Sequence, residues 1–368
     1  MKKKLLAMVL AGVMAVSLTA CGSENGTGSS GDSGAASDSG EKGDASEGEK
    51  EPSSGGASAD AVTLQIGFEN SISEPIGQAL EKWKSLVEEK GDGSLQLELY
   101  PDSQLGSKNE LIDGMTLGEP YITLADGAFY ADYGVPDFGI VFGPFLFDDW
   151  DQCWTLIESD WYQDMCSQLE GKGLKIVTSN WKYGERHTLT TKPVEKVEDL
   201  SGLKIRVPGN QIQSVGFDVL GATSTGMDLG DVYTALQQGT IDGAENPLAT
   251  LYGRKLHEVA SNLILDAHVL NFTTWVMSAD LFNSLSAEQQ ELLVSTGEEA
   301  GLINNDLVDQ SNEEYLQKMK DEGVTVVEPS EEVMQGFRDK AQAFYEKGAD
   351  FGWSDNLYDT VRAAMGAE

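Results

Sequence analysis

Apolar positions recur with two different periods along residues 61–368, and these periods predict an interleaved series of strands and helices. Short apolar runs, some with strict alternation, are typical of strands, whereas apolar residues three or four positions apart are typical of helices. The predicted strands are 62–68, 95–100, 121–125, 174–179, 204–207 and 324–327. The predicted helices cover the segment after Pro75, 108–118, 148–171 with a break near Ser159, 211–220, 230–238 and 286–322.

The alternation of strands with helices predicts an α/β fold. We expect Ser73 to cap the first helix, because Pro75 suits the first helical turn. The β-α-β-α order at the start of this region is similar to one lobe of a periplasmic binding protein. Folds of this kind hold ligands at the carboxyl ends of strands and between lobes.

The first sixty residues follow a different pattern. A basic start precedes an apolar stretch of signal-peptide length that ends in Leu-Thr-Ala-Cys. This ending resembles a bacterial lipobox, which implies that Cys21 is lipidated; a secretion signal with a chance cysteine and a single-span anchor are the alternatives. Residues 22–60 contain no aliphatic side chain larger than Ala, so they cannot bury enough apolar surface to fold. We predict a signal peptide at 1–20, a lipidated tether at 21–60, and an extracytoplasmic globule anchored to the cell membrane.

Charge and cysteine content narrow the possible partners. The net charge of −36 at pH 7 argues against nucleic-acid binding, and an anionic ligand would need a local positive site. Cys153 and Cys166 could pair outside the cytoplasm, but both lie in predicted helices, and we expect two free thiols. A formal dinucleotide-binding match at 26–31 has no strand before it and no helix after it, so it carries no weight.

The sequence offers little support for catalysis. The chain has three histidines, and it contains no His-Glu-x-x-His motif, nucleophile elbow or P-loop. We expect no enzymatic activity, no cofactor and no metal. A carboxylate pair of the glycosidase type stays open, because Asp and Glu are abundant.

Four segments resemble the substrate-binding subunits of tripartite ATP-independent periplasmic (TRAP) transporters, the DctP-like family. They are Tyr-Pro-Asp-Ser-Gln-Leu-Gly at 100–106, Gly-Pro-Phe-Leu-Phe at 143–147, Glu-Asp-Leu-Ser-Gly-Leu-Lys-Ile-Arg-Val-Pro at 198–208, and the segment 232–247 that ends in Gly-Ala-Glu-Asn-Pro. The four segments have the family's order and spacing across most of 61–368, and this makes the resemblance specific.

The resemblance implies a fold and a set of partners. The fold is a two-lobe periplasmic-binding-protein-like one, with a ligand cleft between the lobes and a long helix spanning both. Lobe one would comprise 61–183 plus 272–311, and lobe two 184–271 plus 312–368. The implied partners are a small organic acid and the small and large integral membrane subunits of a TRAP transporter, and we expect the binding protein to be a monomer.

Arg206 is the main candidate for ligand binding. It lies in a short apolar strand, where an unpaired charge is costly, so it needs an anionic partner. The resemblance implies a bidentate salt bridge to the substrate carboxylate, which the planar guanidinium matches. The structural alternative is a salt bridge to an internal Asp or Glu.

The resemblance implies two further contacts to the ligand. Arg186 matches a second family arginine at the same carboxylate; its alternative is an exposed loop residue paired with Glu185. Asn246 matches a ligand-binding asparagine; its alternative is a cap for a helix that begins at Pro247, and one amide could serve both purposes.

Candidates in lobe one follow predicted strands. Glu69 and Asn70 follow the first strand, and Asp126 follows the strand at 121–125. Carboxylates there would accept hydrogen bonds from sugar hydroxyls and repel a second substrate carboxylate. Their alternatives are solvated loop acids or, for Asp126, a helix cap. The aromatic candidates, which could equally lie in the core, are Trp181 and Trp275.

These features favour a solute-binding lipoprotein that captures a sugar acid, either a uronate or an aldonate. C4-dicarboxylate or sialic-acid binding in the same transporter type is the first alternative. A ligand-sensing domain for a sensor kinase is the second.

Overall fold

The computed structural model describes residues 61–367. The predicted signal peptide, the tether and Cys21 lie outside the described residues. None of the helices in 61–367 is both long and apolar enough to cross a lipid bilayer.

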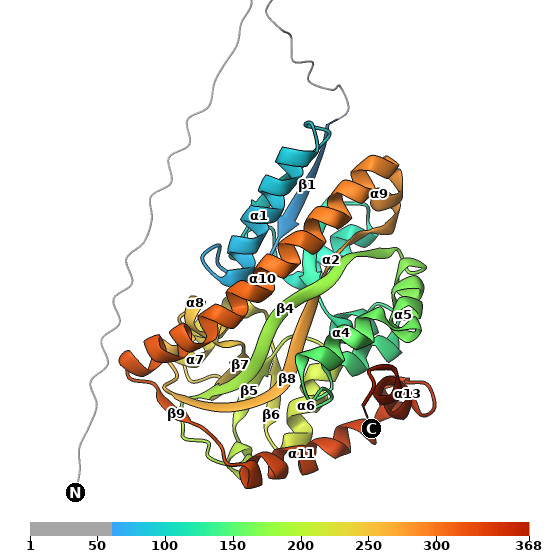
Figure 1. The fold of residues 1–368 in the computed structure, drawn as a ribbon. Helices are drawn as coiled ribbons and strands as arrows, with labels where there is room; N and C mark the ends of the chain where they lie inside the picture. Colours follow the sequence, from blue (N-terminus) through green and yellow to red (C-terminus); the bar gives the residue numbers. More distant parts are fainter. Residues whose placement is uncertain (1–60, 368) are drawn as a thin grey trace, which may run out of the picture. The chain divides into compact units, whose positions relative to one another are not determined.

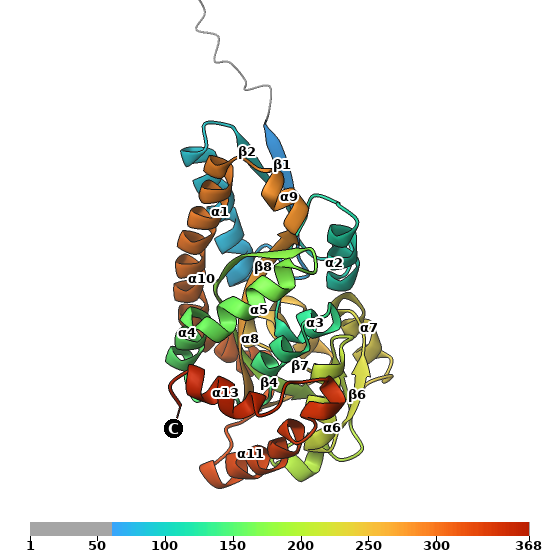
Figure 2. The same ribbon diagram turned by 90° about the vertical axis from the view of Figure 1, so that its right-hand side faces the viewer.

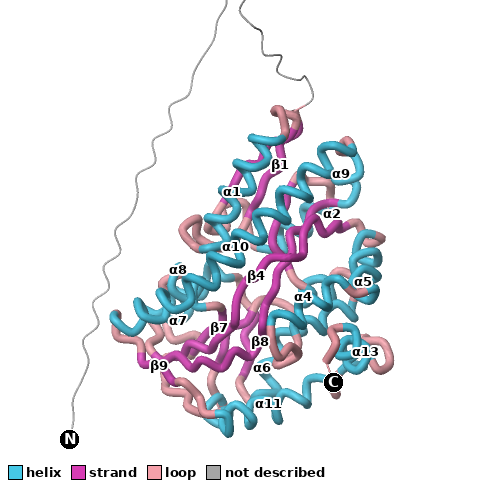
Figure 3. Tube along the Cα trace, viewed as in Figure 1, coloured by secondary structure: helices cyan, strands magenta, loops and turns pink. Residues whose placement is uncertain are grey.

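Nine strands form one mixed sheet within the described residues. They are β1 (Val62–Gly67), β2 (Leu95–Tyr100), β3 (Tyr121–Ala125), β4 (Leu174–Thr190), β5 (Lys204–Val207), β6 (Thr223–Gly226), β7 (Gly243–Asn246), β8 (Asn262–Ser278) and β9 (Thr325–Val327). Their order is β2-β1-β3-β8-β4-β7-β5-β6, and β9 pairs with β8. Figure 3 shows the strands as a continuous band that runs from β1 to β9.

The two central strands, β4 and β8, connect the two halves of this sheet. Each has 17 residues, and they pair antiparallel from Leu174 and Ser278 at one end to Thr190 and Asn262 at the other. The parallel strands β1, β2 and β3 extend the sheet beside one end of this pair, and β5, β6, β7 and β9 extend it beside the other end. Several register shifts interrupt the β4–β8 ladder, and such irregularities bend and twist strands.

Thirteen α-helices surround the sheet within residues 61–367. They are α1 (Pro75–Lys90), α2 (Lys108–Thr116), α3 (Gly127–Asp132), α4 (Trp150–Glu158), α5 (Asp160–Glu170), α6 (Gln211–Leu220), α7 (Val232–Gln237), α8 (Leu248–Gly253), α9 (Ala279–Ser284), α10 (Ala287–Asp321), α11 (Glu331–Tyr345), α12 (Gly348–Phe351) and α13 (Leu357–Ala364). Helix α10, with 35 residues, crosses the molecule and packs on α1, β4 and α8 (Figure 1). Figure 2 shows α1 and α10 together on one side, with α2 and α7 on the opposite side.

The core beside α10 is built on three fully buried tryptophans. The ring centroids of Trp83, Trp181 and Trp275 lie 5.3 to 5.9 Å apart. Helix α10 approaches them closely because Gly297 and Gly301 have no side chains. A Cβ at Gly297 would lie 2.7 Å from the Trp83 ring, and one at Gly301 would lie 2.8 Å from the Trp181 ring.

The α/β prediction is confirmed, and so are most of the predicted helices and strands. The prediction for Ser73 is wrong: the capping position is Glu74, whose carboxylate instead accepts from the backbone N–H of Ser71 and from the side chains of Asn70 and Thr250. The strand predicted at 174–179 continues to Thr190, and β8 was not predicted. Both strands depend on pairing with distant segments, which local periodicity does not contain.

Cys153 is buried and Cys166 is half-buried, and both are free thiols. Burial raises the pKa of Cys166 to about 12, so this thiol is protonated at neutral pH.

Candidate ligand-binding site

A small cavity of about 350 Å³ lies where several strands of the sheet end. Glu69 follows β1, Asp126 follows β3, and Asn246 is the last residue of β7. Arg206 comes from β5, and Arg186 comes from the middle of β4. The topology therefore brings five of the predicted site residues to one cavity, at the carboxyl ends of parallel strands.

Arg206 is a buried cation without a counter-ion among residues 61–367. Its side chain is 2% exposed, and its Nε donates a hydrogen bond of 2.8 Å to the carbonyl oxygen of Met227. No carboxylate of the described residues forms an ion pair with this guanidinium. Burial lowers the pKa of Arg206 from its ordinary value, although Glu69 and Glu245 oppose the shift. A desolvated cation beside a cavity is a strong site for an anion.

Arg186 is equally buried but fully paired. Its Nε and Nη2 donate hydrogen bonds of 2.5 and 2.6 Å to the carboxylate oxygens of Glu245, and its Nη1 donates to Asn271 at 3.1 Å. Burial alone would lower the pKa of Arg186, but the charge and hydrogen bonds of Glu245 outweigh it and raise this pKa. The alternatives predicted for Arg186, an exposed position and a pair with Glu185, are wrong, because the residue is inside β4 and next to β7.

The Arg186–Glu245 pair continues into a buried chain of alternating charges. His268 Nε2 lies 3.3 Å from Glu245, and His268 Nδ1 lies 3.2 Å from Asp266. Burial would lower the pKa of His268, but the two carboxylates outweigh it and raise this pKa to about 9. Burial would raise the pKa of Glu245, but Arg186 and His268 outweigh it and lower this pKa to about 2. The chain is therefore close to neutral as a unit, and it fixes Arg186 in place.

Two amides face the cavity with unused hydrogen-bonding capacity. Asn246 is 2% exposed, and its side chain makes no hydrogen bond with the other described residues. The predicted capping role for Asn246 is wrong, since α8 begins after Pro247 without a side-chain cap. Gln213 Oε1 accepts from Asn210, and its own amide group lines the cavity. Both side chains are available to a polar ligand.

Another part of the cavity wall carries Glu69, Lys108 and Asp126. Lys108 Nζ lies 3.7 Å from Glu69 Oε2 and 4.5 Å from the centre of the Phe129 ring. Asp126 Oδ1 accepts from the backbone N–H of Ala128 at 3.0 Å, so the predicted capping role is confirmed. Burial raises the pKa of Asp126, against the charges of Lys108 and Arg186.

Three predicted candidates do not line this cavity. The rings of Trp181 and Trp275 are fully buried in the tryptophan core, because β4 and β8 turn these side chains toward α10 and α1. Asn70 is also buried, and its Nδ2 donates to Glu74 at 2.7 Å and to Thr250 at 3.1 Å.

The sequence analysis missed six polar residues that line this cavity or contact its arginines. They are Lys108, Tyr183, Gln213, Glu245, Asn271 and Thr273. Two of these had a usable signal: Glu245 precedes Asn246 within a family-like segment, and Lys108 follows another such segment at 100–106. The rest lie in β4, β8 and α6, at positions without a local sequence signature.

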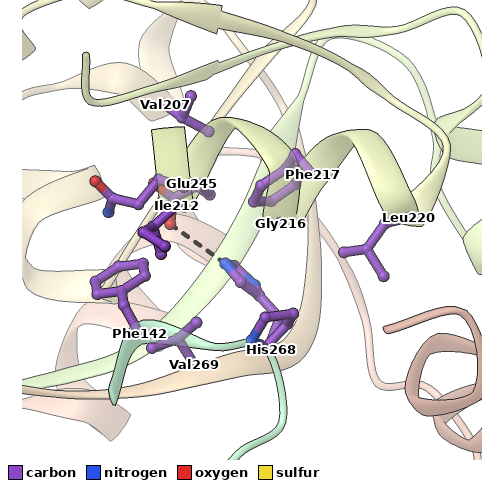
Figure 4. Close-up of a pocket in the computed structure, with 11 residues that line it drawn as sticks. Phe142, Val207, Ile212, Gly216, Phe217, Leu220, Glu245, His268 and Val269 are labelled. Carbon is purple, nitrogen blue, oxygen red and sulfur yellow. Dashed lines mark hydrogen bonds and ion pairs between the residues drawn. The ribbon is translucent and has the colours of Figure 1, made fainter. Parts of the chain in front are cut away.

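A second, mainly apolar pocket of about 290 Å³ lies behind the first. Figure 4 shows Val207, Ile212 and Phe217 around the pair of His268 and Glu245. Gln213 lines both cavities. The apolar surroundings explain why the Glu245 carboxylate requires two cationic partners.

The described residues contain no group of three or more His, Cys, Asp or Glu side chains that could hold a metal ion. The first cavity thus offers one unpaired guanidinium, two amides, and a wall with two carboxylates and one ammonium group. This set can bind a small anion at one end and polar groups at the other.

The bacterial extracellular solute-binding proteins of family 7 (DctP) match residues 66–350. A sialic acid-binding periplasmic protein of Vibrio cholerae is 30% identical over 78% of this chain and 88% of its own length. A TRAP periplasmic solute-binding protein of Ochrobacterium anthropi, solved with bound L-fuconate, has a TM-score of 0.80 and 35% identity, covering 83% of this chain and 99% of that one. Another from Actinobacillus succinogenes, with bound L-galactonate, has a TM-score of 0.77 and 34% identity, covering 83% and 99%.

Proposed function

This chain belongs to family 7 of the bacterial extracellular solute-binding proteins, the two-lobe proteins that bind small organic acids for TRAP transporters, and we propose that its ligand is a sugar acid whose carboxylate pairs with Arg206. The observation that carries this proposal is the state of Arg206: buried, without a counter-ion among the described residues, and beside a cavity. An incoming carboxylate supplies the missing charge, and its two oxygens match the two free ends of the guanidinium.

The remaining polar groups favour a hydroxylated ligand. Asn246 and Gln213 can each donate to or accept from a hydroxyl group. Glu69 and Asp126 accept hydrogen bonds from hydroxyl groups and disfavour a second carboxylate. The relatives with bound L-fuconate and L-galactonate are consistent with this choice.

The arrangement suggests how binding proceeds. The ligand docks on lobe two at Arg206, the lobes close, and Glu69 and Asp126 of lobe one add their contacts. Closure is favoured only if the ligand binds the closed state more tightly than the open one. The lobe boundaries given above, the lipid on Cys21, the monomeric state and the delivery to two membrane subunits belong to the same proposal.

A thermal-shift screen tests the ligand class. The screen compares uronates, aldonates, C4-dicarboxylates, sialic acid and 2-oxo acids, and we expect sugar acids to raise the melting temperature with increasing concentration. Arg206→Ala should reduce affinity by roughly 100-fold or more, as expected for one partner of a buried charged pair, and leave the ligand-free melting temperature almost unchanged.

The matched control is Arg338→Ala, because Arg338 is a partly exposed residue of α11 paired with Glu331 and does not line the cavity. This control should bind normally. Undiminished binding by Arg206→Ala would refute the assignment of the anchor, and a response to dicarboxylates alone would refute the ligand class.

A further inference from the structure

Lys108 is a cation in an unfavourable place for the folded chain alone. It is the first residue of α2, where the positive end of the helix dipole disfavours a cation. Its side chain is only 11% exposed, and its ammonium group makes no hydrogen bond with the described residues. The closest carboxylate oxygen, on Glu69, lies 3.7 Å away, which is too far for a hydrogen bond. The N–H donors of Lys108 are thus free to serve a ligand in the cavity.

When the charged side chains of the cavity are paired, one carboxylate, Asp126, has no cationic partner in the described part of the chain. Arg186 is matched by Glu245 within the buried chain, and Lys108 is matched by Glu69. Arg206 takes the ligand carboxylate under the function proposed above. Asp126 then stays as a buried carboxylate without a salt-bridge partner among residues 61–367. The backbone N–H of Ala128 already donates to its Oδ1. Hydrogen-bond donors on the ligand would add to this stabilisation, because a buried charge without a salt-bridge partner is costly.

We propose that Lys108 and Asp126 form a hydroxyl-reading pair that determines specificity at the end of the cavity opposite Arg206. A hydroxyl group both donates and accepts, so it can donate to Asp126 and accept from Lys108 at the same time. A carboxylate or phosphate at that position can only accept, and it would add a second negative charge beside Asp126 and Glu69. This inference rests on the proposed function and restricts the ligands to monoanionic acids with a hydroxylated far end.

Pairs of sugar acids that differ only at the far end provide the test. The probes are gluconate with glucarate, galactonate with galactarate, and erythronate with meso-tartrate, in which the terminal hydroxymethyl group is replaced by a second carboxylate. Isothermal titration calorimetry gives the ratio of affinities within each pair for the wild-type protein, Asp126→Asn and Lys108→Met.

We expect the wild-type protein to prefer the monoacid of the pair that fits best. Asp126→Asn removes the repelling charge while keeping the shape, so it should shift the ratio toward the diacid by roughly tenfold or more. Lys108→Met removes the closest cation of Glu69, so it should weaken monoacid binding. Because burial already raises the pKa of Asp126, the loss should diminish as the pH is lowered from 7 to 5. Lys108→Arg should recover part of the affinity.

The outcomes separate this inference from the proposed function. If the wild-type protein binds a monoacid through Arg206 but Asp126→Asn leaves the ratio unchanged, the hydroxyl-reading pair is wrong and the function stands. The same conclusion follows if Lys108→Met weakens binding equally at every pH. If no sugar acid binds the wild-type protein, the proposed function itself is wrong.

Discussion

Two arginines from β4 and β5, the strands on either side of β7, border the same cavity, but their surroundings differ. Arg186 in β4 donates three hydrogen bonds to Glu245, two to its carboxylate and one to its carbonyl oxygen, and a fourth to Asn271. A chain of buried charges continues from Glu245 through His268 to Asp266. Arg206 in β5 has one hydrogen bond, to the carbonyl oxygen of Met227. Both side chains are almost completely buried.

Under the function proposed above, this difference separates a mainly structural charge, Arg186, from the charge that anchors the ligand, Arg206. Arg186 is already neutralised, so a ligand gains little by adding a charge to it, although its position shapes the cavity wall. Arg206 is desolvated without compensation, so the protein has already met the cost of removing its water. Burial does not distinguish the two arginines, whereas the missing counter-ion does, and the proposed role of Arg206 depends on it.

The largest effect on stability should come from disrupting the ion pair between Arg186 and Glu245. Arg186→Met leaves Glu245 buried with His268 as its remaining cationic partner and should lower the free energy of unfolding by about 3–5 kcal/mol. The double variant Arg186→Met/Glu245→Gln removes both charges and should recover much of this loss. Urea unfolding followed by circular dichroism measures both. A single variant as stable as the wild-type protein would show that the pair is not structural.

The pH dependence of stability should come from His268, which belongs to the same buried chain of charges as Arg186. The folded pKa of His268 is about 9, above its ordinary value of 6.5, so its stabilising contribution is complete below pH 6.5 and is lost as the pH rises through 9. We expect the free energy of unfolding to fall by on the order of 1–3 kcal/mol between pH 6.5 and 9.5.

The two neighbouring histidines provide an internal control for this prediction. Burial lowers the pKa of His187 to about 4, although Asp266 opposes the shift. Imidazole resonances in NMR titrations should therefore separate His268, charged up to about pH 9, from His187, neutral above about pH 4. Ordinary titration of both rings near pH 6.5 would contradict the charge chain.

The smallest effect should come from the second, mainly apolar pocket, which Gly216 lines. Gly216 lies inside α6, and a Cβ added there meets no atom within 4 Å. Gly216→Ala should stabilise the protein by up to about 1 kcal/mol, because Ala is the better helix former. Gly301→Ala is the matched control, since its Cβ would lie 2.5 Å from Asn180 Oδ1, and it should destabilise. Thermal unfolding distinguishes the two, and equal shifts would contradict the packing described here.

Local patterns were sufficient for much of the fold. The strand at 204–207 and the helix at 211–220 were predicted with the observed bounds, and the break near Ser159 separates α4 from α5. Their signals are periodicity and capping residues within a few positions. Strands β4 and β8 were missed or shortened, because their stability comes from each other across 70 to 100 residues of sequence.

The candidate site could be predicted only in part, because local patterns identify some of its residues and not others. Glu69 and Asp126 follow recognisable strands, and Arg206 lies in a family-like segment, so each could be selected by position. Trp181 and Trp275 could not be separated from core residues by pattern, and the structure places both in the core.

The α/β class, the family resemblance and the short list of candidate cations in an acidic chain follow from the sequence alone. Which of these cations is neutralised depends on the tertiary structure. The β4–β7 register places Thr188 opposite Glu245 and thereby brings Arg186 to that carboxylate, 59 positions away in the chain. Whether a buried charge is paired depends on distances of a few ångströms between distant segments, and neither composition nor periodicity encodes those distances.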